Sequence, residues 1–284
     1  MTWDSAATTA MTRTRSTTRT DPNTAPSRAL RPSGQLSAER SAVALEGVSK
    51  RYAGENGVLA LDGISLSIRP GEFLTLVGAS GCGKSTLLNL VSGLDQPTSG
   101  SVEVDGHAAF MFQEHALFPW LSALDNVATP LRLRGVGRKD REAQARDYLR
   151  AVHLADFADR RPHELSGGMR QRVAIARTLA TAAPVLLMDE PFGSLDAMTR
   201  DLLHDELESI WRERGLTVLF VTHNVREAVR LGDRVVLLSS RPGRIVAEYD
   251  VAIDRPRRIE DPDVSALAGE ITNALRKEVA RHGA

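Results

Sequence analysis

The feature that most constrains the fold is a glycine-rich segment between two regular elements. Residues Gly78-Ala79-Ser80-Gly81-Cys82-Gly83-Lys84-Ser85 match the pattern GxxxxGK[ST]. The segment follows the β-rich apolar run 73–77, and a run with helical spacing begins at Lys84. In such an arrangement the glycines let successive N–H groups point inward, and the helix start adds positive partial charge. The sequence therefore predicts a phosphate-binding loop in an α/β domain.

The side chains of this loop have distinct expected roles. Lys84 would reach the β- and γ-phosphates of ATP as a point charge, and the Ser85 hydroxyl would bind Mg²⁺. Cys82 takes a free position in the pattern, and we interpret it as a small filler rather than a redox sensor. The residues expected to contact ATP here are Gly78, Ser80, Gly81, Cys82, Gly83, Lys84, Ser85 and Thr86.

A second segment supplies carboxylates. Four apolar residues, 185–188, form a predicted buried strand, and Asp189 and Glu190 follow directly. Parallel sheets place their ligand sites at this carboxyl edge. We expect Asp189 to bind Mg²⁺ and Glu190, one residue further, to polarise the water that attacks the γ-phosphate.

The rest of the chain alternates strands with helices. A mostly parallel sheet covered on both faces follows from this order. Residues 121–161 differ, because their pattern is helical with few strand signals, and we expect an inserted helical subdomain at about 114–165. The predicted strands are 43–48, 61–68, 73–77, 101–104, 108–112, 185–189, 218–222 and 234–239. The predicted helices after residue 165 are 167–179, 197–214 and 225–231.

Composition and spacing suggest three parts. Residues 1–41 are rich in Thr, Ser, Pro and Arg, and they have too few large apolar side chains to offset the entropy of ordering. We expect a disordered tail there; its Arg-rich, acid-poor character also resembles a transit peptide, but prolines interrupt any amphipathic helix. An ATPase domain is expected at 42–253 and a C-terminal helical extension at 254–284. That helix is expected to pack on the body, with a regulatory contact as the alternative.

Bulk properties exclude some classes. Lys and Arg number 36, as do Asp and Glu, so the formal net charge is zero, which argues against a nucleic-acid partner. The single cysteine forms no internal disulfide, which favours a reduced, cytosolic compartment. No apolar stretch approaches the ~20 residues of a membrane span, so any span belongs to another chain.

A further motif narrows the family. Leu165-Ser166-Gly167-Gly168-Met169-Arg170-Gln171-Arg172 closely resembles the LSGGQ-type signature of ABC ATPases, with Met169 in place of the commonest Gln. Ser166, Gly167 and Gly168 open a helix with free N–H groups, which makes a second anion-binding helix start. The resemblance implies that these residues contact the γ-phosphate held by a partner subunit.

Four other residues match the family in order. Gln113 resembles the Q-loop glutamine, which senses the γ-phosphate and Mg²⁺, and Asp196 lies in a segment that resembles the D-loop at the dimer seam. His223 is similar to the switch histidine that contacts the γ-phosphate. Tyr52 matches the aromatic residue that stacks on adenine. Gln113, His223 or Tyr52 alone would be interpreted as structural. In family order with the stronger motifs they become expected site residues, with Gln113, Glu190 and His223 in the catalytic step.

The resemblance also implies a fold and a system. It implies a P-loop NTPase core with a mostly parallel sheet, an antiparallel β subdomain and the inserted helical subdomain. Residues 112–121 and 241–245 look like those of importers for nitrate, sulfonate or taurine. Such a subunit hydrolyses ATP with Mg²⁺ as a homodimer on the cytoplasmic face of the cell membrane. Its partners are integral-membrane permease subunits and, indirectly, an extracytoplasmic solute-binding protein.

Alternatives remain at this stage. The apolar segment 117–120 suits a groove for a permease helix, and internal packing of the helical subdomain is the other interpretation. A soluble ABC ATPase without a transport role is disfavoured because one cassette is present and no heptad array appears. A small-molecule kinase leaves the segment Ser166–Gly168 unexplained. A catalytically inactive ATPase conflicts with the intact Lys84, Asp189, Glu190 and His223.

Overall fold

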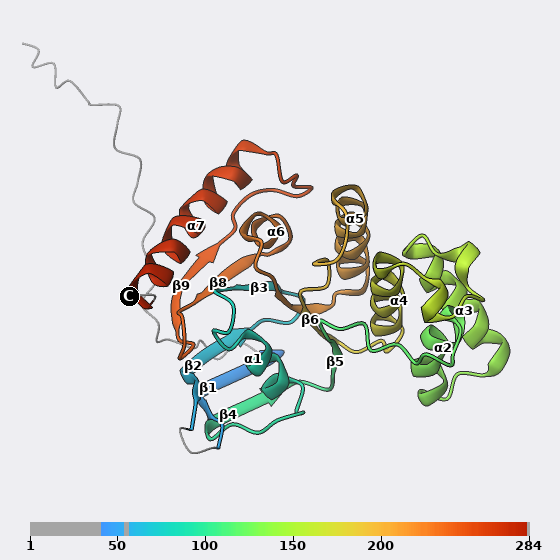
Figure 1. The fold of residues 1–284 in the computed structure, drawn as a ribbon, viewed down its shortest axis with the longest axis horizontal. Coiled ribbons are helices and arrows are strands. Elements are labelled where there is room, and N and C mark those ends of the chain that lie inside the picture. The colour runs from blue at the N-terminus through green and yellow to red at the C-terminus, as the bar shows by residue number, and fades with distance from the viewer. Residues whose placement is uncertain (1–40, 54–56, 283–284) are drawn as a thin grey trace, which may run out of the picture. The chain divides into compact units, whose positions relative to one another are not determined.

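The computed structural model describes residues 41–53 and 57–282 (Figure 1). The expected disordered tail, residues 1–41, lies outside the described residues except for Ser41. Among the helices of the described part, none is both long and apolar enough to cross a membrane.

The larger sheet has six strands in the order β5-β6-β7-β3-β8-β9. All neighbours are parallel except β8 and β9, which confirms the prediction of a mostly parallel sheet. Every residue of β3, β6 and β7 is buried, as expected for strands with helices on both faces. The strands are β3 (Phe73–Val77), β5 (Ala108–Met111), β6 (Val185–Asp189), β7 (Thr217–Val221), β8 (Arg234–Leu238) and β9 (Ile245–Asp250).

Three of these strands, β5, β7 and β8, end one residue before the predicted limit, and β7 and β8 do so for a local reason. The hydroxyls of Thr222 and Ser239 bond within the loops that follow: Asn224 N donates to Thr222 Oγ1 at 3.0 Å, and Ser239 Oγ donates to the Pro242 carbonyl at 2.7 Å. Both residues therefore begin turns rather than extend the ladder.

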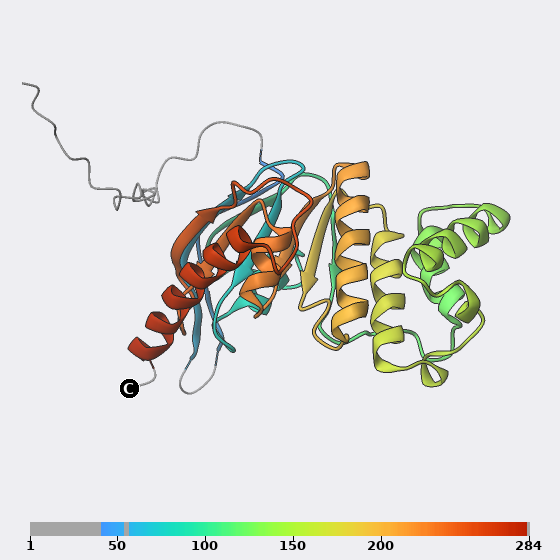
Figure 2. The same cartoon turned by 90° about the horizontal axis from the view of Figure 1, so that it is seen from above.

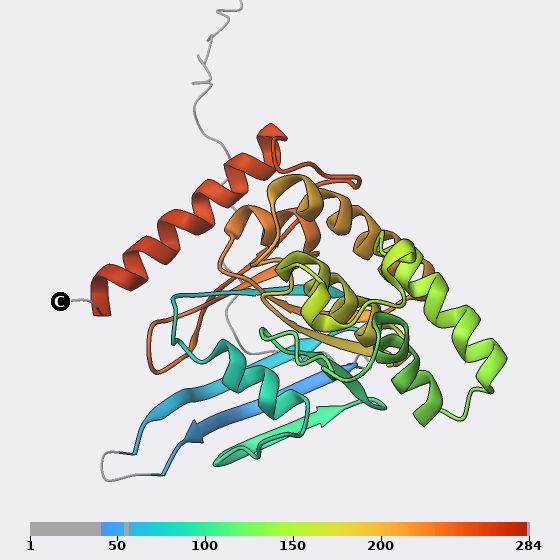
Figure 3. The ribbon, with the colours of Figure 1, turned by 45° about the vertical axis from the view of Figure 1, so that its right-hand side comes forward.

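The smaller sheet is antiparallel in the order β2-β1-β4, which confirms the antiparallel subdomain. Its strands are β1 (Val43–Arg51), β2 (Leu59–Ile68) and β4 (Ser99–Val104). The strand predicted to end at Val48 continues to Arg51, because Gly47, at φ 58°, lies in a register shift rather than at a strand end. Helix α1 (Lys84–Val91) contacts β2 and β4 of this sheet and β6 of the larger one (Figure 3).

Side-chain caps fix the starts of the three helices predicted after residue 165. Ser166, Asp196 and Asn224 each accept a hydrogen bond from a backbone N–H of the first turn of α4 (Gly167–Leu179), α5 (Ala197–Arg214) and α6 (Val225–Leu231). The three helices have the predicted bounds. Beyond α4, Figure 2 shows α2 (Ala123–Leu133) and α3 (Arg138–Ala151) grouped at one end, with short 3₁₀ turns at Ala155–Phe157 and Pro162–Glu164. The predicted helical region is confirmed.

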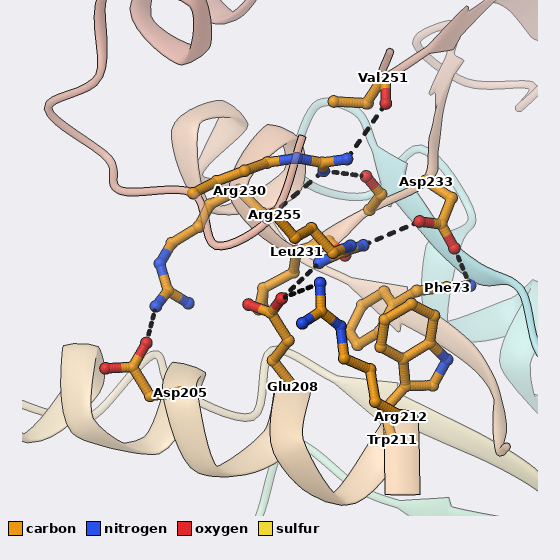
Figure 4. A network of polar contacts seen from close by, with 12 residues as sticks. Phe73, Asp205, Glu208, Trp211, Arg212, Arg230, Leu231, Asp233, Val251 and Arg255 are labelled. Atoms are coloured by element: carbon orange, nitrogen blue, oxygen red, sulfur yellow. Dashed lines mark hydrogen bonds and ion pairs between the residues drawn. The ribbon is translucent and has the colours of Figure 1, made fainter. Parts of the chain in front are cut away.

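The C-terminal segment packs on the body. Helix α7 (Pro262–His282) lies against α6 and buries Val264, Ala268 and Ile271. Before it, Arg255 extends toward α5, with Nη2 2.9 Å from Asp233 Oδ1 and its guanidinium carbon 4.6 Å from the centroid of the Trp211 ring (Figure 4).

Arg257 completes this anchor. Its side chain is 3% exposed and donates hydrogen bonds to backbone carbonyls that include Val229 and Gly232 at the end of α6. Burial, together with the charge of Arg255, lowers the pKa of Arg257 to about 10. A cation at a helix C-terminus meets unpaired carbonyls, so the segment after β9 is held to α6.

Candidate nucleotide-binding site

A cavity of about 370 Å³ opens where the carboxyl ends of β3 and β6 meet the glycine loop. It brings together ten of the residues predicted from the sequence: Tyr52, Ser80, Gly81, Gly83, Lys84, Ser85, Thr86, Gln113, Asp189 and Glu190. Three residues not predicted to bind nucleotide, Val58, Ala60 and Arg241, complete its lining. The carboxyl edge of a parallel sheet is where ligands bind in α/β folds.

The loop has the geometry of a cradle. Gly81 and Gly83 have φ values of 75° and 104°, which favour glycine, and a Cβ on Gly83 would lie 2.9 Å from the Ala60 carbonyl oxygen. Lys84 is 8% exposed, and its Nζ donates to the carbonyls of Gly78 and Ala79 at 2.9 and 3.0 Å. These two carbonyl oxygens hold the ammonium group at the loop, and phosphate oxygens can replace them as hydrogen-bond acceptors.

Gly78 and Cys82, which were expected to contact ATP, do not line the cavity. Gly78 faces the interior, where an added Cβ would meet Cys82 Sγ at 2.7 Å. The Cys82 side chain is 1% exposed, and burial raises the pKa of its thiol. This agrees with its interpretation as a filler.

The carboxylate of Asp189 and the hydroxyl of Ser85 lie together in the cavity lining. Asp189 ends β6, is 5% exposed and is hydrogen-bonded to the side chain of Ser85. Burial raises the pKa of Asp189, and the Ser85 hydrogen bond and the charge of Lys84 oppose the increase. A hydroxyl and one carboxylate fit Mg²⁺, which is usually bound by one or two carboxylates together with substrate phosphates. No cluster of three or more His, Cys, Asp or Glu that could hold a metal occurs in the described ranges.

Glu190 has an unusual backbone. Its φ of 47° lies in the left-handed region, which costs a non-glycine residue about 1–3 kcal/mol. Hydrogen bonds on both sides hold it: Glu190 N donates to the Val221 carbonyl at 2.9 Å, and Gly193 N donates to the Glu190 carbonyl at 3.1 Å. The conformation turns the chain at the end of β6 and leaves the carboxylate in the cavity, with Oε2 3.0 Å from His223 Nδ1. His223 does not line the cavity itself and is connected to it through Glu190.

A buried polar chain that the sequence analysis missed supports the loop of His223. His204 of α5 is fully buried, and its Nε2 lies 2.8 Å from Glu227 Oε1. The other Glu227 oxygen accepts the Thr222 hydroxyl. His204 has helical spacing with Leu207 and Trp211, so the sequence pattern could have indicated that His204 lies on the buried face of its helix.

The signature residues lie elsewhere. Ser166, Gly167 and Gly168 are at the start of α4, and Asp196 caps α5, and none of the four lines the cavity. The Ser166 hydroxyl accepts from Met169 N at 3.2 Å. His115, which matches none of the sequence motifs, contacts the Gly167 carbonyl through Nε2 at 2.9 Å. The chain's own cavity is therefore built without the signature segment.

The segment 117–120 was predicted either to receive a permease helix or to pack inside the helical subdomain, and its residues differ in this respect. Leu117 packs against the helical core, whereas Phe118 and Trp120 are 37% and 68% exposed. The buried Asn126 holds Phe118 in place, because its Oδ1 accepts from Phe118 N at 2.8 Å and its Nδ2 donates to the Phe118 carbonyl at 3.2 Å. An aromatic pair is thus presented at the surface from a fixed backbone.

Comparisons with known proteins agree with this geometry. The family model "ABC transporter" matches residues 61–193. The taurine import ATP-binding protein TauB of Burkholderia thailandensis is 50% identical over 240 residues, which cover 81% of this chain and 89% of that protein. The nitrate import ATP-binding protein NrtD of a Synechocystis species is 44% identical over 247 residues, covering 81% and 93%. The dimeric structure of the bacterial ABC transporter cassette MJ0796 superposes with a TM-score of 0.70 at 36% identity, covering 75% of this chain and all of that one.

Proposed function

Because this chain belongs to the family of ABC transporter ATP-binding proteins, we propose that it hydrolyses ATP to drive uptake of a small anion such as taurine, an aliphatic sulfonate or nitrate. The observation that carries the ATPase assignment is the convergence of Lys84, Ser85, Asp189 and Glu190 in one cavity. The cargo class rests on the likeness to taurine and nitrate import proteins.

The proposed binding step uses groups that already face the cavity. Lys84 exchanges the carbonyls of Gly78 and Ala79 for the β- and γ-phosphates, and the loop N–H groups bind phosphate oxygens. Tyr52, 40% exposed at the cavity, is proposed to stack on adenine. Ser85 and Asp189, with Gln113, would hold Mg²⁺, which supplies positive charge to the phosphate oxygens.

In the proposed hydrolytic step, water attacks the γ-phosphorus of ATP, its proton passes to Glu190, and ADP leaves. The contact of 3.0 Å between Glu190 Oε2 and His223 Nδ1 orients the carboxylate. The strained backbone of Glu190 fixes this position before substrate arrives, so less reorganisation is needed during the reaction.

The second half of the site is proposed to come from another copy. Ser166, Gly167 and Gly168 offer a helix start that the chain's own cavity does not use, and Asp196 lies at the start of the next helix. ATP bound between the glycine loop of one copy and the α4 start of the other would close the dimer, and hydrolysis would release it. The dimeric MJ0796 cassette supports this arrangement.

The remaining partners are proposed from the exposed aromatic pair. Phe118 and Trp120 would dock a helix of an integral-membrane permease at the cytoplasmic face of the membrane. An extracytoplasmic solute-binding protein would deliver the anion to that permease.

Growth of a strain that lacks this gene tests the proposal. The strain should lose growth on taurine or an alkanesulfonate as sole sulfur source, or on nitrate as sole nitrogen source, and the intact gene should restore it. Trp120→Asp should fail to restore growth although the purified protein still binds MgADP, because only docking is lost. Leu133→Asp is the control, since Leu133 is 80% exposed on α2. Unimpaired growth of the deletion strain on all three sources would contradict the cargo class, and full rescue by Trp120→Asp would contradict the docking role.

A further inference from the structure

Arg241 reaches the nucleotide cavity from a part of the chain that is distant in sequence. It lies in the loop between β8 and β9, and its guanidinium lines the cavity together with the glycine loop. Nε and Nη2 both lie 3.3 Å from the Gly81 carbonyl oxygen. Both nitrogens lie on the same edge of the guanidinium group. Their distance to the oxygen is at the upper limit for an N–H···O hydrogen bond, so both hydrogen bonds are weak.

The loop that carries Arg241 is fixed on both sides. Ser239 Oγ accepts from Arg244 N at 2.9 Å, which closes the turn. Gly243 N donates to the Ala60 carbonyl at 2.8 Å, and Asp62 N donates to the Gly243 carbonyl at 3.0 Å, which joins the loop to β2. A Cβ on Gly243 would lie 2.3 Å from the Cys82 carbonyl oxygen, so the close approach to the glycine loop requires glycine there.

Charge distinguishes Arg241 from its neighbour Arg244. Arg244 forms an ion pair with Asp62 and does not line the cavity. Across residues 41–53 and 57–282, no acidic side chain forms an ion pair with Arg241. The cavity lining therefore includes, in addition to Lys84, an arginine on a rigid loop that has no counter-ion among the described residues.

We propose that Arg241 is a second cationic nucleotide-binding residue, whose guanidinium donates hydrogen bonds to phosphate oxygens of the bound nucleotide. A guanidinium is always charged and its fork matches phosphate oxygens. The inference rests on the nucleotide site proposed above. It assigns a role to the segment Arg241–Arg244: backbone bonds of Gly243 hold the loop to β2, Arg241 is placed at the phosphates, and Arg244 pairs with Asp62 outside the cavity.

Calorimetric titration with MgADP, which is not turned over, tests this role in the full chain. Arg241→Ala should weaken binding about tenfold, the lower end expected for a charge-assisted hydrogen bond at an exposed side chain. Arg241→Lys should recover part of the affinity, because the charge remains while the fork is lost. Arg244→Ala removes the same charge from the same loop and should change binding less than twofold. Raising NaCl should narrow the gap between wild type and Arg241→Ala, since salt screens exposed charges.

The outcomes separate the inference from the proposed function. If wild type binds MgADP, Lys84→Ala weakens binding and Arg241→Ala does not, the role of Arg241 is wrong and the nucleotide site stands. If Arg244→Ala weakens binding as much as Arg241→Ala, or if Arg241→Lys is no better than Arg241→Ala, the phosphate contact is also wrong. If wild type does not bind MgADP, the nucleotide site and this inference fail together. Thermal unfolding of each variant verifies that the fold is retained.

Discussion

Two glycine-rich helix starts in this chain, those of α1 and α4, have the same local chemistry and different surroundings. The α1 start lies in a cavity with Asp189, Glu190 and Arg241. The α4 start has its Ser166 hydroxyl engaged as a cap and lies outside that cavity. The carboxyl edge of a parallel sheet gathers groups from several strands at one place, whereas the α4 start follows a 3₁₀ turn rather than a strand. We infer that one copy folds with one half of the site assembled and the other half exposed for a partner.

Glu190→Gln gives the largest expected effect and tests the α1 side. Removing the proton acceptor should lower the rate of phosphate release about 10²–10⁴-fold, while MgATP binding is retained and closed dimers accumulate. The measurements are phosphate release and size-exclusion chromatography with MgATP. Glu213→Gln, on the exposed side of α5, is the matched control. Turnover by Glu190→Gln close to the wild-type rate would refute the assignment of the base.

Ser166→Arg addresses the α4 side and should separate binding from hydrolysis. The added bulk and charge would block the approach of a second copy, so hydrolysis should fall about 100-fold, the loss expected for a missing transition-state donor set. MgADP binding by the monomer should change less than twofold, because the α4 start is outside the chain's own cavity. A parallel loss of monomer binding would show that the two helix starts serve one site within one copy.

The same comparison explains how much the sequence could predict. The glycine loop, the strand before it and the helices 167–179, 197–214 and 225–231 depend on local patterns and caps, and the structure has them as predicted. Arg241 and the polar pair His204 and Glu227 could not be predicted. Arg241 meets Gly81 across 160 residues, and His204 meets Glu227 across 23, so only the folded topology brings these groups together.

The end of β1 shows the limit of local patterns in another way. The sequence predicts a strand that ends at Val48, whereas in the sheet register shifts beyond Leu45 let β1 continue to Arg51 beside β2 and β4. A bulge is defined by the partner strand, and periodicity within one strand does not contain that information.

The smallest expected effects are on stability, and they should have opposite signs at the two helix starts. Burial raises the pKa of Asp189, so the folded state binds its proton more tightly than the unfolded state does. At pH 7.5 the buried carboxylate therefore destabilises the fold, and this penalty shrinks as pH falls through the raised pKa toward the unfolded value. Asp189→Asn should raise the free energy of unfolding at pH 7.5, and the gain should shrink on acidification.

Ser166→Ala should do the reverse, because it removes the cap of α4 and should lower the free energy of unfolding by about 1 kcal/mol. That loss should not depend on pH, since neither the hydroxyl nor the Met169 N–H titrates in this range. Urea denaturation of both variants at several pH values measures the pair. Destabilisation by both substitutions at pH 7.5 would mean that Asp189 is a net structural support. The predicted opposite effects on stability at the α1 and α4 starts would then be wrong.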